Sequence, residues 1–240
     1  MGEPPVFPLP PPAQAGVSCR VEAGAAFDWL RQGWAMFAAG PAVWFGASLL
    51  VLLGGLALCI VPLIGPRVAA LLLPVVMAGF LQMCRHQQDG EAPRLSDLFA
   101  GFQAGQGALV VIGVCFMLAL WGIGGLADLL ATTRPGGGPW AMFGGWMRGL
   151  LLTLPLLLPL LMALFFAPAL ALFNRLPAAA AMRASFVACA ANGLPLLVFG
   201  LILGVLAFFA ALPILLGFLI LLPVMVGASY AAYRDIFPSA

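Results

Sequence analysis

Long stretches without a charged side chain constrain this fold more than any other feature of the sequence. The longest, from Leu194 to Tyr233, contains no Asp, Glu, Lys, Arg or His. As one helix of about 40 residues it would be roughly 60 Å long, about twice the hydrocarbon thickness of a bilayer. The run must therefore fold back, most simply near Pro213, and form two membrane-spanning helices.

Four other apolar runs are long enough to cross a membrane, since a spanning helix needs about 20 apolar residues. They occupy residues 42–64, 68–84, 108–127 and 149–173. The composition agrees, because 8% of the residues are charged, against about a quarter in soluble domains. We therefore predict an all-α polytopic membrane protein with six transmembrane helices.

A less apolar segment precedes each expected pair of spans, at residues 22–38, 94–105 and 178–191. The third segment is rich in Ala and carries Arg183. The apolar faces of the first two are formed by Phe27, Leu30, Trp34 and Phe37, and by Leu95, Leu98, Phe99 and Phe102. Amphipathic helices of this kind lie in the membrane interface. For residues 22–38, packing on protein rather than lipid is an equally good interpretation.

One triplet recurs at the same place in each unit: Leu72-Leu73-Pro74, Leu157-Leu158-Pro159 and Leu221-Leu222-Pro223. Together with the surface segments, it predicts three pseudo-repeated hairpins, each preceded by an amphipathic interfacial helix. The repeat units would be residues 22–84, 95–173 and 178–233. We expect one membrane domain over residues 20–237, after a disordered Pro-rich tail at residues 1–19.

Arginines are distributed unevenly over the two sides of this expected bundle. One side holds Arg20, Arg31, Arg85, Arg94, Arg175, Arg183 and Arg234, and the other holds Arg67, Arg134 and Arg148. Positively charged residues concentrate in the cytoplasmic loops of membrane proteins. This asymmetry predicts that both termini are cytoplasmic, together with the three surface segments.

Prolines and glycines inside the expected spans allow two interpretations. Pro74, Pro159 and Pro223 each remove a backbone donor and favour a kink. Such breaks can shape helix packing or can form a transporter binding site; we expect packing. Gly200 and Gly204 form a GxxxG pair, which lets helices approach closely. We expect it to mediate an internal contact, with a dimer as the alternative.

Chemically active motifs are absent from the sequence. The expected spans contain no Asp, Glu, Lys, Arg or His, which argues against a proton-driven pump or a charge-lined channel. There is no hydrolase or P-loop motif, and we interpret His86 as a solvated loop residue. The five cysteines are scattered, so no metal site or cofactor is expected. A net charge of +2 gives no basis for nucleic-acid binding.

A resemblance to a known family rests on several short motifs. These are Gly33-Trp34, Gly40-Pro41, Leu98-Phe99-Ala100-Gly101-Phe102, Ala184-Ser185-Phe186 and Tyr233-Arg234-Asp235-Ile236-Phe237. Over about residues 20–237 the chain resembles an uncharacterised family of proteobacterial multipass inner-membrane proteins. More distantly, it looks like the membrane domain attached to some glycerophosphodiester phosphodiesterases. Their catalytic domain has no counterpart here, so the resemblance implies no activity.

These observations favour a non-enzymatic role in the bacterial inner membrane. We expect a scaffold, a lipid-interacting protein or a partner-binding protein, with the lipid bilayer and another membrane protein as candidate partners. The alternative is a carrier for a small neutral or lipophilic solute. An intramembrane enzyme is a third class, which the sequence favours least.

Overall fold

The computed structural model describes residues 16–103, 107–130, 139–213 and 216–238. Most of the predicted Pro-rich tail and the Gly-rich loop around residue 136 lie outside these ranges. The described elements are α1 (Ala25–Ala39), α2 (Pro41–Cys59), α3 (Gly65–Gln88), the 3-10 helix η1 (Leu95–Phe102), α4 (Gly107–Leu130), α5 (Pro139–Phe165), α6 (Ala167–Phe173), α7 (Ala178–Ala191), α8 (Gly193–Ala211) and α9 (Phe218–Ile236). The predicted all-α class is confirmed.

In the described part of the chain, six helical segments are long and apolar enough to cross a membrane. They are Pro41–Cys59, Gly65–Gln88, Gly107–Ala127, Thr153–Phe173, Gly193–Ala211 and Phe218–Ile236. Each corresponds to one of the six predicted spans, with small differences at the ends. The reversal between the last two spans falls next to Pro213, as the sequence predicts.

The fourth span differs from the prediction because it is two helices rather than one. The α-helical hydrogen bond from the Phe166 amide to the Met162 carbonyl is replaced by the hydroxyl of Ser185 on α7. The Phe166 N–H donates to Ser185 Oγ at 2.9 Å, and Ser185 Oγ donates to the Met162 carbonyl at 2.7 Å. Since buried backbone groups need partners, this hydroxyl supports the break between α5 and α6.

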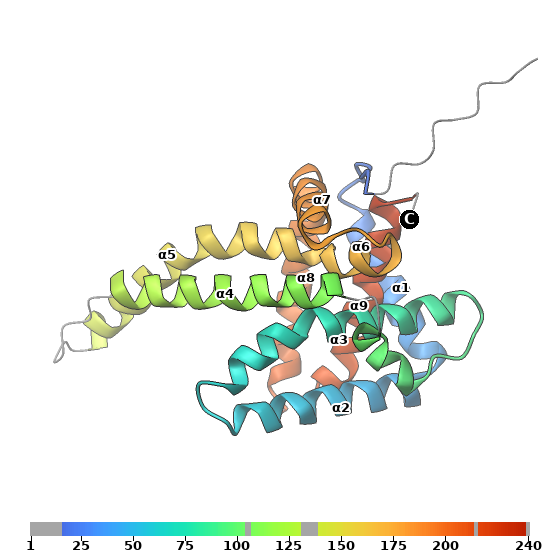
Figure 1. Ribbon diagram of the computed structural model, residues 1–240, viewed down its shortest axis with the longest axis horizontal. Coiled ribbons are helices and arrows are strands. Elements are labelled where there is room, and N and C mark those ends of the chain that lie inside the picture. The colour runs from blue at the N-terminus through green and yellow to red at the C-terminus, as the bar shows by residue number, and fades with distance from the viewer. Residues whose placement is uncertain (1–15, 104–106, 131–138, 214–215, 239–240) are drawn as a thin grey trace, which may run out of the picture.

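The segments that precede the hairpins pack on neighbouring helices in a cyclic order. α1 packs along α9, η1 packs on α3, and α7 packs on α5 and α6. In Figure 1, α1 lies beside α9 although the two occupy opposite ends of the chain. Each segment thus contacts the returning helix of the hairpin before it, and the first segment contacts the last hairpin. For residues 22–38, protein packing is therefore the better of the two interpretations. The second segment differs from the prediction, because it is a 3-10 helix.

Two glycines, Gly33 on α1 and Gly101 on η1, allow close contacts of this kind. A Cβ atom added at Gly33 would lie 2.3 Å from the Val224 carbonyl oxygen, and one added at Gly101 would lie 2.3 Å from that of Val75. Only a residue without a side chain fits against the partner helix at this distance. α1 and η1 therefore sit on α9 and α3 in a similar way.

The three prolines of the recurring triplet lie at comparable places along the chain. Pro74 is in a span that ends at Gln88, Pro159 in one that ends at Phe173, and Pro223 in one that ends at Ile236. Pro74 and Pro223 are buried, whereas Pro159 is exposed. The Gly33 and Gly101 contacts involve the residues that follow Pro223 and Pro74. These likenesses support the internal repeat, which stays a prediction until the units are superposed.

The predicted internal contact at the GxxxG pair is wrong. A Cβ atom added at Gly200 or Gly204 would have no neighbour within 4 Å. The reason is the rotation of α8, which turns a different face inward: Pro195, Phe199, Leu203 and Ala210. Gly200 and Gly204 lie on the outward face with Leu201, which is 70% exposed.

Much of the spanning surface is apolar and faces outward. Buried residues make up 11% of the α8 span and 17% of the α2 span, against 67% of the α9 span. The α4–α5 hairpin also projects beyond the other helices at the left of Figure 1. Apolar surface of this extent must be covered in the native environment. Of the helices α2, α8 and α9, α9 is the most buried and lies at the centre of the molecule.

Candidate functional site at three helix ends

The last turns of α3 and α9 and the end of α6 meet at one end of the molecule. The Tyr230 hydroxyl donates to Gln88 Oε1 at 2.9 Å, and the Tyr233 hydroxyl donates to Asn174 Oδ1 at 2.6 Å. The Phe173 ring lies 5.9 Å from that of Tyr230 and 5.7 Å from that of Tyr233. Three apolar helices thus end in a common polar and aromatic cluster, which is the arrangement expected at a membrane boundary.

A polar pocket of about 210 Å³ opens in this cluster. It is lined by Arg85, Gln88, Asp89, Phe173, Tyr230, Tyr233 and Arg234. The Arg85 guanidinium lies 5.0 Å from the centre of the Phe173 ring, a cation–π distance. Arg85 Nε is 4.0 Å from Asp89 Oδ2, and both side chains are about half exposed, so this ion pair is weak. The pocket therefore contains two cations and one anion.

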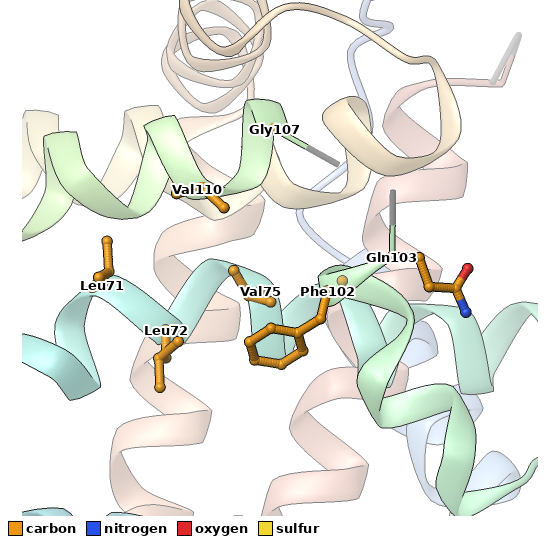
Figure 2. Close-up of a pocket in the computed structure, with 8 residues that line it drawn as sticks. Leu71, Leu72, Val75, Phe102, Gln103, Gly107 and Val110 are labelled. Carbon is orange, nitrogen blue, oxygen red and sulfur yellow. The ribbon is translucent and has the colours of Figure 1, made fainter. Parts of the chain in front are cut away.

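Two other hollows are mostly apolar. The first, of about 220 Å³, lies between α3, η1 and α4 and is shown in Figure 2. Figure 2 shows the Phe102 ring beside Val75, while the Gln103 amide points away from both. The second, of about 320 Å³, lies between α4 and α5 and includes Ile123 and Leu156. Hydrocarbon chains are the chemical group that such surfaces accept.

The sequence-predicted aromatic residues lie outside the polar pocket. Trp34 is 55% exposed and its ring is 5.7 Å from that of the half-buried Phe37. Phe99 and Phe102 are both 55% exposed, with ring centres 6.4 Å apart. Of these four, Phe102 lines the apolar hollow in Figure 2. Trp34 and Phe37 on α1, and Phe99 and Phe102 on η1, form two separate aromatic pairs.

His86 differs from its interpretation as a solvated loop residue, because it lies in the last turn of α3 and has a carboxylate partner. Its Nδ1 is 3.0 Å from Asp97 Oδ2 on η1, and its Nε2 is 2.8 Å from the Gln82 amide nitrogen. Asp97 is buried and also accepts the backbone N–H of Arg94 at 2.9 Å. An amide nitrogen can only donate, so His86 Nε2 accepts and Nδ1–H donates to Asp97. Both ring nitrogens are therefore engaged.

Further hydrogen bonds connect the first three helices beside this end. The Gln87 amide donates to the Met36 carbonyl at 2.8 Å, and the buried Trp44 indole donates to Gln87 Oε1 at 2.9 Å. Cys19, the last residue of the predicted tail, donates from its backbone N–H to the Ile236 carbonyl at 2.7 Å. Sequence reasoning missed these partners, since no local pattern indicates which distant residues meet.

The described part of the chain contains no candidate metal site. No group of three His, Cys, Asp or Glu side chains comes together there. Cys189 on α7 is buried, and burial raises the pKa of its thiol to about 12. The thiolate is the reactive form of cysteine, so Cys189 is a packing residue.

Comparison with known proteins finds a distant relative. A "probable inner membrane protein" of Burkholderia thailandensis is 27% identical over 226 residues, covering 88% of this chain and 82% of the relative. No family model matches the chain, and no solved structure matches it. The likeness extends over nearly the whole chain, and the relative's name agrees with the six apolar helices. The chain is an integral multipass protein of the inner membrane.

Proposed function

We propose that this inner-membrane protein has a non-enzymatic role as a lipid-interacting scaffold. The observation that carries the proposal is the polar pocket where α3, α6 and α9 end. Arg85 and Arg234 line it near the ends of three candidate spans, where the chain would leave the hydrocarbon. Phosphate groups of lipids lie at this level of a bilayer, and Arg binds them through paired N–H donors.

The outward surface of the spans supports the same proposal. α2 and α8 expose most of their length, and the exposed Trp34 and Phe102 lie on the short elements that precede hairpins. Aromatic side chains at this level anchor proteins in the interface. Lipid contacts would therefore extend from the headgroup pocket along the apolar helices.

A non-enzymatic role agrees with the arrangement around His86. A general base needs a free ring nitrogen within hydrogen-bond reach of the group that it deprotonates. Here Asp97 and Gln82 occupy both nitrogens. We infer that the pair connects η1 to α3 and contributes to folding.

The proposed orientation places the polar end and both termini in the cytoplasm. Arg85, Arg175 and Arg234 all lie at or just after the ends of spans that converge there. An excess of Arg marks the cytoplasmic side. Three repeated hairpins, each with its preceding surface element, complete the proposed architecture.

A deletion strain tests the proposed function. The phospholipid composition of its inner membrane and its survival under envelope stress would be compared with those of the wild type and of a strain complemented in trans. We expect an altered composition or increased stress sensitivity, restored by complementation. An unchanged membrane together with lost uptake of a neutral or lipophilic solute would contradict the scaffold and establish the carrier.

A further inference from the structure

We infer that the pocket between the ends of α3, α6 and α9 binds the phosphate of an anionic phospholipid headgroup. This inference rests on the proposed lipid-interacting function and names the lipid class and the residues that select it. Arg85 and Arg234 would hold the phosphate, and Tyr230, Tyr233 and Phe173 would form the aromatic wall beside it.

The charges in the pocket favour an anionic lipid over a zwitterionic one. Two guanidinium groups face one carboxylate, so the pocket has one more cation than anion. Asp89 is 4.0 Å from Arg85 Nε and is 60% exposed, which leaves Arg85 only weakly neutralised. Among the described residues Arg234 has no ion pair within 4.0 Å. A headgroup without an ammonium group matches this surplus of positive charge.

The geometry leaves the guanidinium groups available to a ligand. The tyrosine hydroxyls are already used, because they donate to Gln88 and Asn174. They hold the three helix ends together and keep the pocket open. Arg85 lies over the Phe173 ring, and the ring carries no acceptor atom, so this contact leaves the guanidinium N–H donors to a ligand. Arg234 extends from the last turn of α9 and is exposed.

The position of the pocket favours a lipid over a soluble anion as its ligand, because three candidate spans end beside it. α3 ends at Gln88, the fourth span ends at Phe173 and α9 ends at Ile236. A phosphate held among these ends lies where the hydrocarbon of the bilayer stops. A lipid bound there can also place its acyl chains along the apolar helices, which a free phosphate cannot do.

Native mass spectrometry of the purified, delipidated protein tests the inference. The full chain in detergent would be titrated with phosphatidylglycerol, with phosphatidylethanolamine and with inorganic phosphate. The variant R85Q/R234Q would be compared with R31Q/R183Q, which also removes two exposed positive charges from the polar side of the molecule. Size-exclusion profiles would confirm that each protein is folded, and R234Q alone serves if the double variant does not fold.

We expect the wild type and R31Q/R183Q to retain one phosphatidylglycerol in preference to phosphatidylethanolamine. R85Q/R234Q should bind that lipid about ten-fold more weakly, or about 1.4 kcal/mol. Equal affinity of the two double variants would overturn the site while leaving a lipid-interacting function in place. Equal retention of both lipids would overturn the selectivity for anionic headgroups. Saturation by inorganic phosphate without lipid would overturn the lipid assignment.

Discussion

The indole of Trp29 donates a hydrogen bond to Asp235 Oδ2 at 3.0 Å, which joins α1 to the last turn of α9. Trp29 is 1% exposed, and its ring also meets the edge of Phe199 at 5.7 Å. The contact connects residues 206 positions apart in the sequence. It holds α1 against α9, so that the segment before the first hairpin packs on the last hairpin.

Replacing Trp29 by Phe should destabilise the folded protein. Phe keeps much of the apolar contact but leaves Asp235 without its donor, and a hydrogen bond to a charged group contributes about 1.5–3 kcal/mol. The measurement is the midpoint of thermal unfolding in detergent. Trp34→Phe is the control, because Trp34 is 55% exposed and should tolerate the change. Equal midpoints for the two variants would mean that α1 is not held by this contact.

Alanine at two helical glycines should have opposite effects. Gly33→Ala places a methyl group 2.3 Å from the Val224 carbonyl oxygen, and such overpacking costs about 1–3 kcal/mol. Gly200→Ala has open space around it and should gain about 0.5–1 kcal/mol from the better helix propensity of Ala. The yield of folded protein in the membrane reports both. A loss at Gly200 instead would reveal a close contact of α8 with another chain.

Removing the Ser185 hydroxyl should weaken the junction between α5 and α6. Ser185→Ala leaves the Phe166 N–H and the Met162 carbonyl without the bridge between them. A buried group left unsatisfied costs about 1–3 kcal/mol. The exposed Ser96 provides the control as Ser96→Ala. Hydrogen exchange of the amides at residues 164–170 should increase for Ser185→Ala alone, and unchanged exchange would contradict the bridge.

Cysteine labelling should report the orientation. In spheroplasts an impermeant maleimide should modify Leu63→Cys, in the turn after α2, but should reach Cys19 only after the membrane is permeabilised. Each of these two cysteines is tested in a variant from which the other exposed cysteines have been removed. Cys189 is the internal negative control: with a pKa of about 12, only roughly 1 in 10,000 of its thiols is ionised at pH 8. Its labelling rate should stay low and rise about ten-fold for each pH unit below that pKa, in proportion to the thiolate fraction. Immediate labelling of Cys19 in intact spheroplasts would place the polar end outside.

The sequence predicts the spans well because their limits are local. Four uncharged runs end where polar or turn residues let the chain leave the hydrocarbon, and the fifth, at residues 194–233, is too long for one span and reverses next to Pro213. The five runs therefore give the six helical segments. The break at Phe166 could not be predicted in this way. It involves Ser185, a residue of the next helix whose hydroxyl bridges Phe166 and Met162, together with Pro168 in the first turn of α6.

The candidate site depends even more on distant contacts. Arg85, Phe173 and Arg234 each look like an ordinary span end, and only the packing of α3, α6 and α9 places them around one pocket. In the same way His86 gains its partner Asp97 only because η1 folds back onto α3. Side chains that a local pattern identifies, such as Trp34 and Phe99, lie on the outward surface instead.

The lipid that accompanies the protein out of the membrane tests the central claim most directly. Wild-type protein would be extracted with its surrounding lipid into polymer-bounded discs, and the lipid would be compared with that of the bulk inner membrane. The account predicts that anionic phospholipids are enriched in the discs of the wild type and are reduced to the bulk proportion for R85Q/R234Q. If the discs of the folded wild-type protein contained the same proportion of anionic phospholipids as the bulk inner membrane, the result would contradict a lipid-selective function.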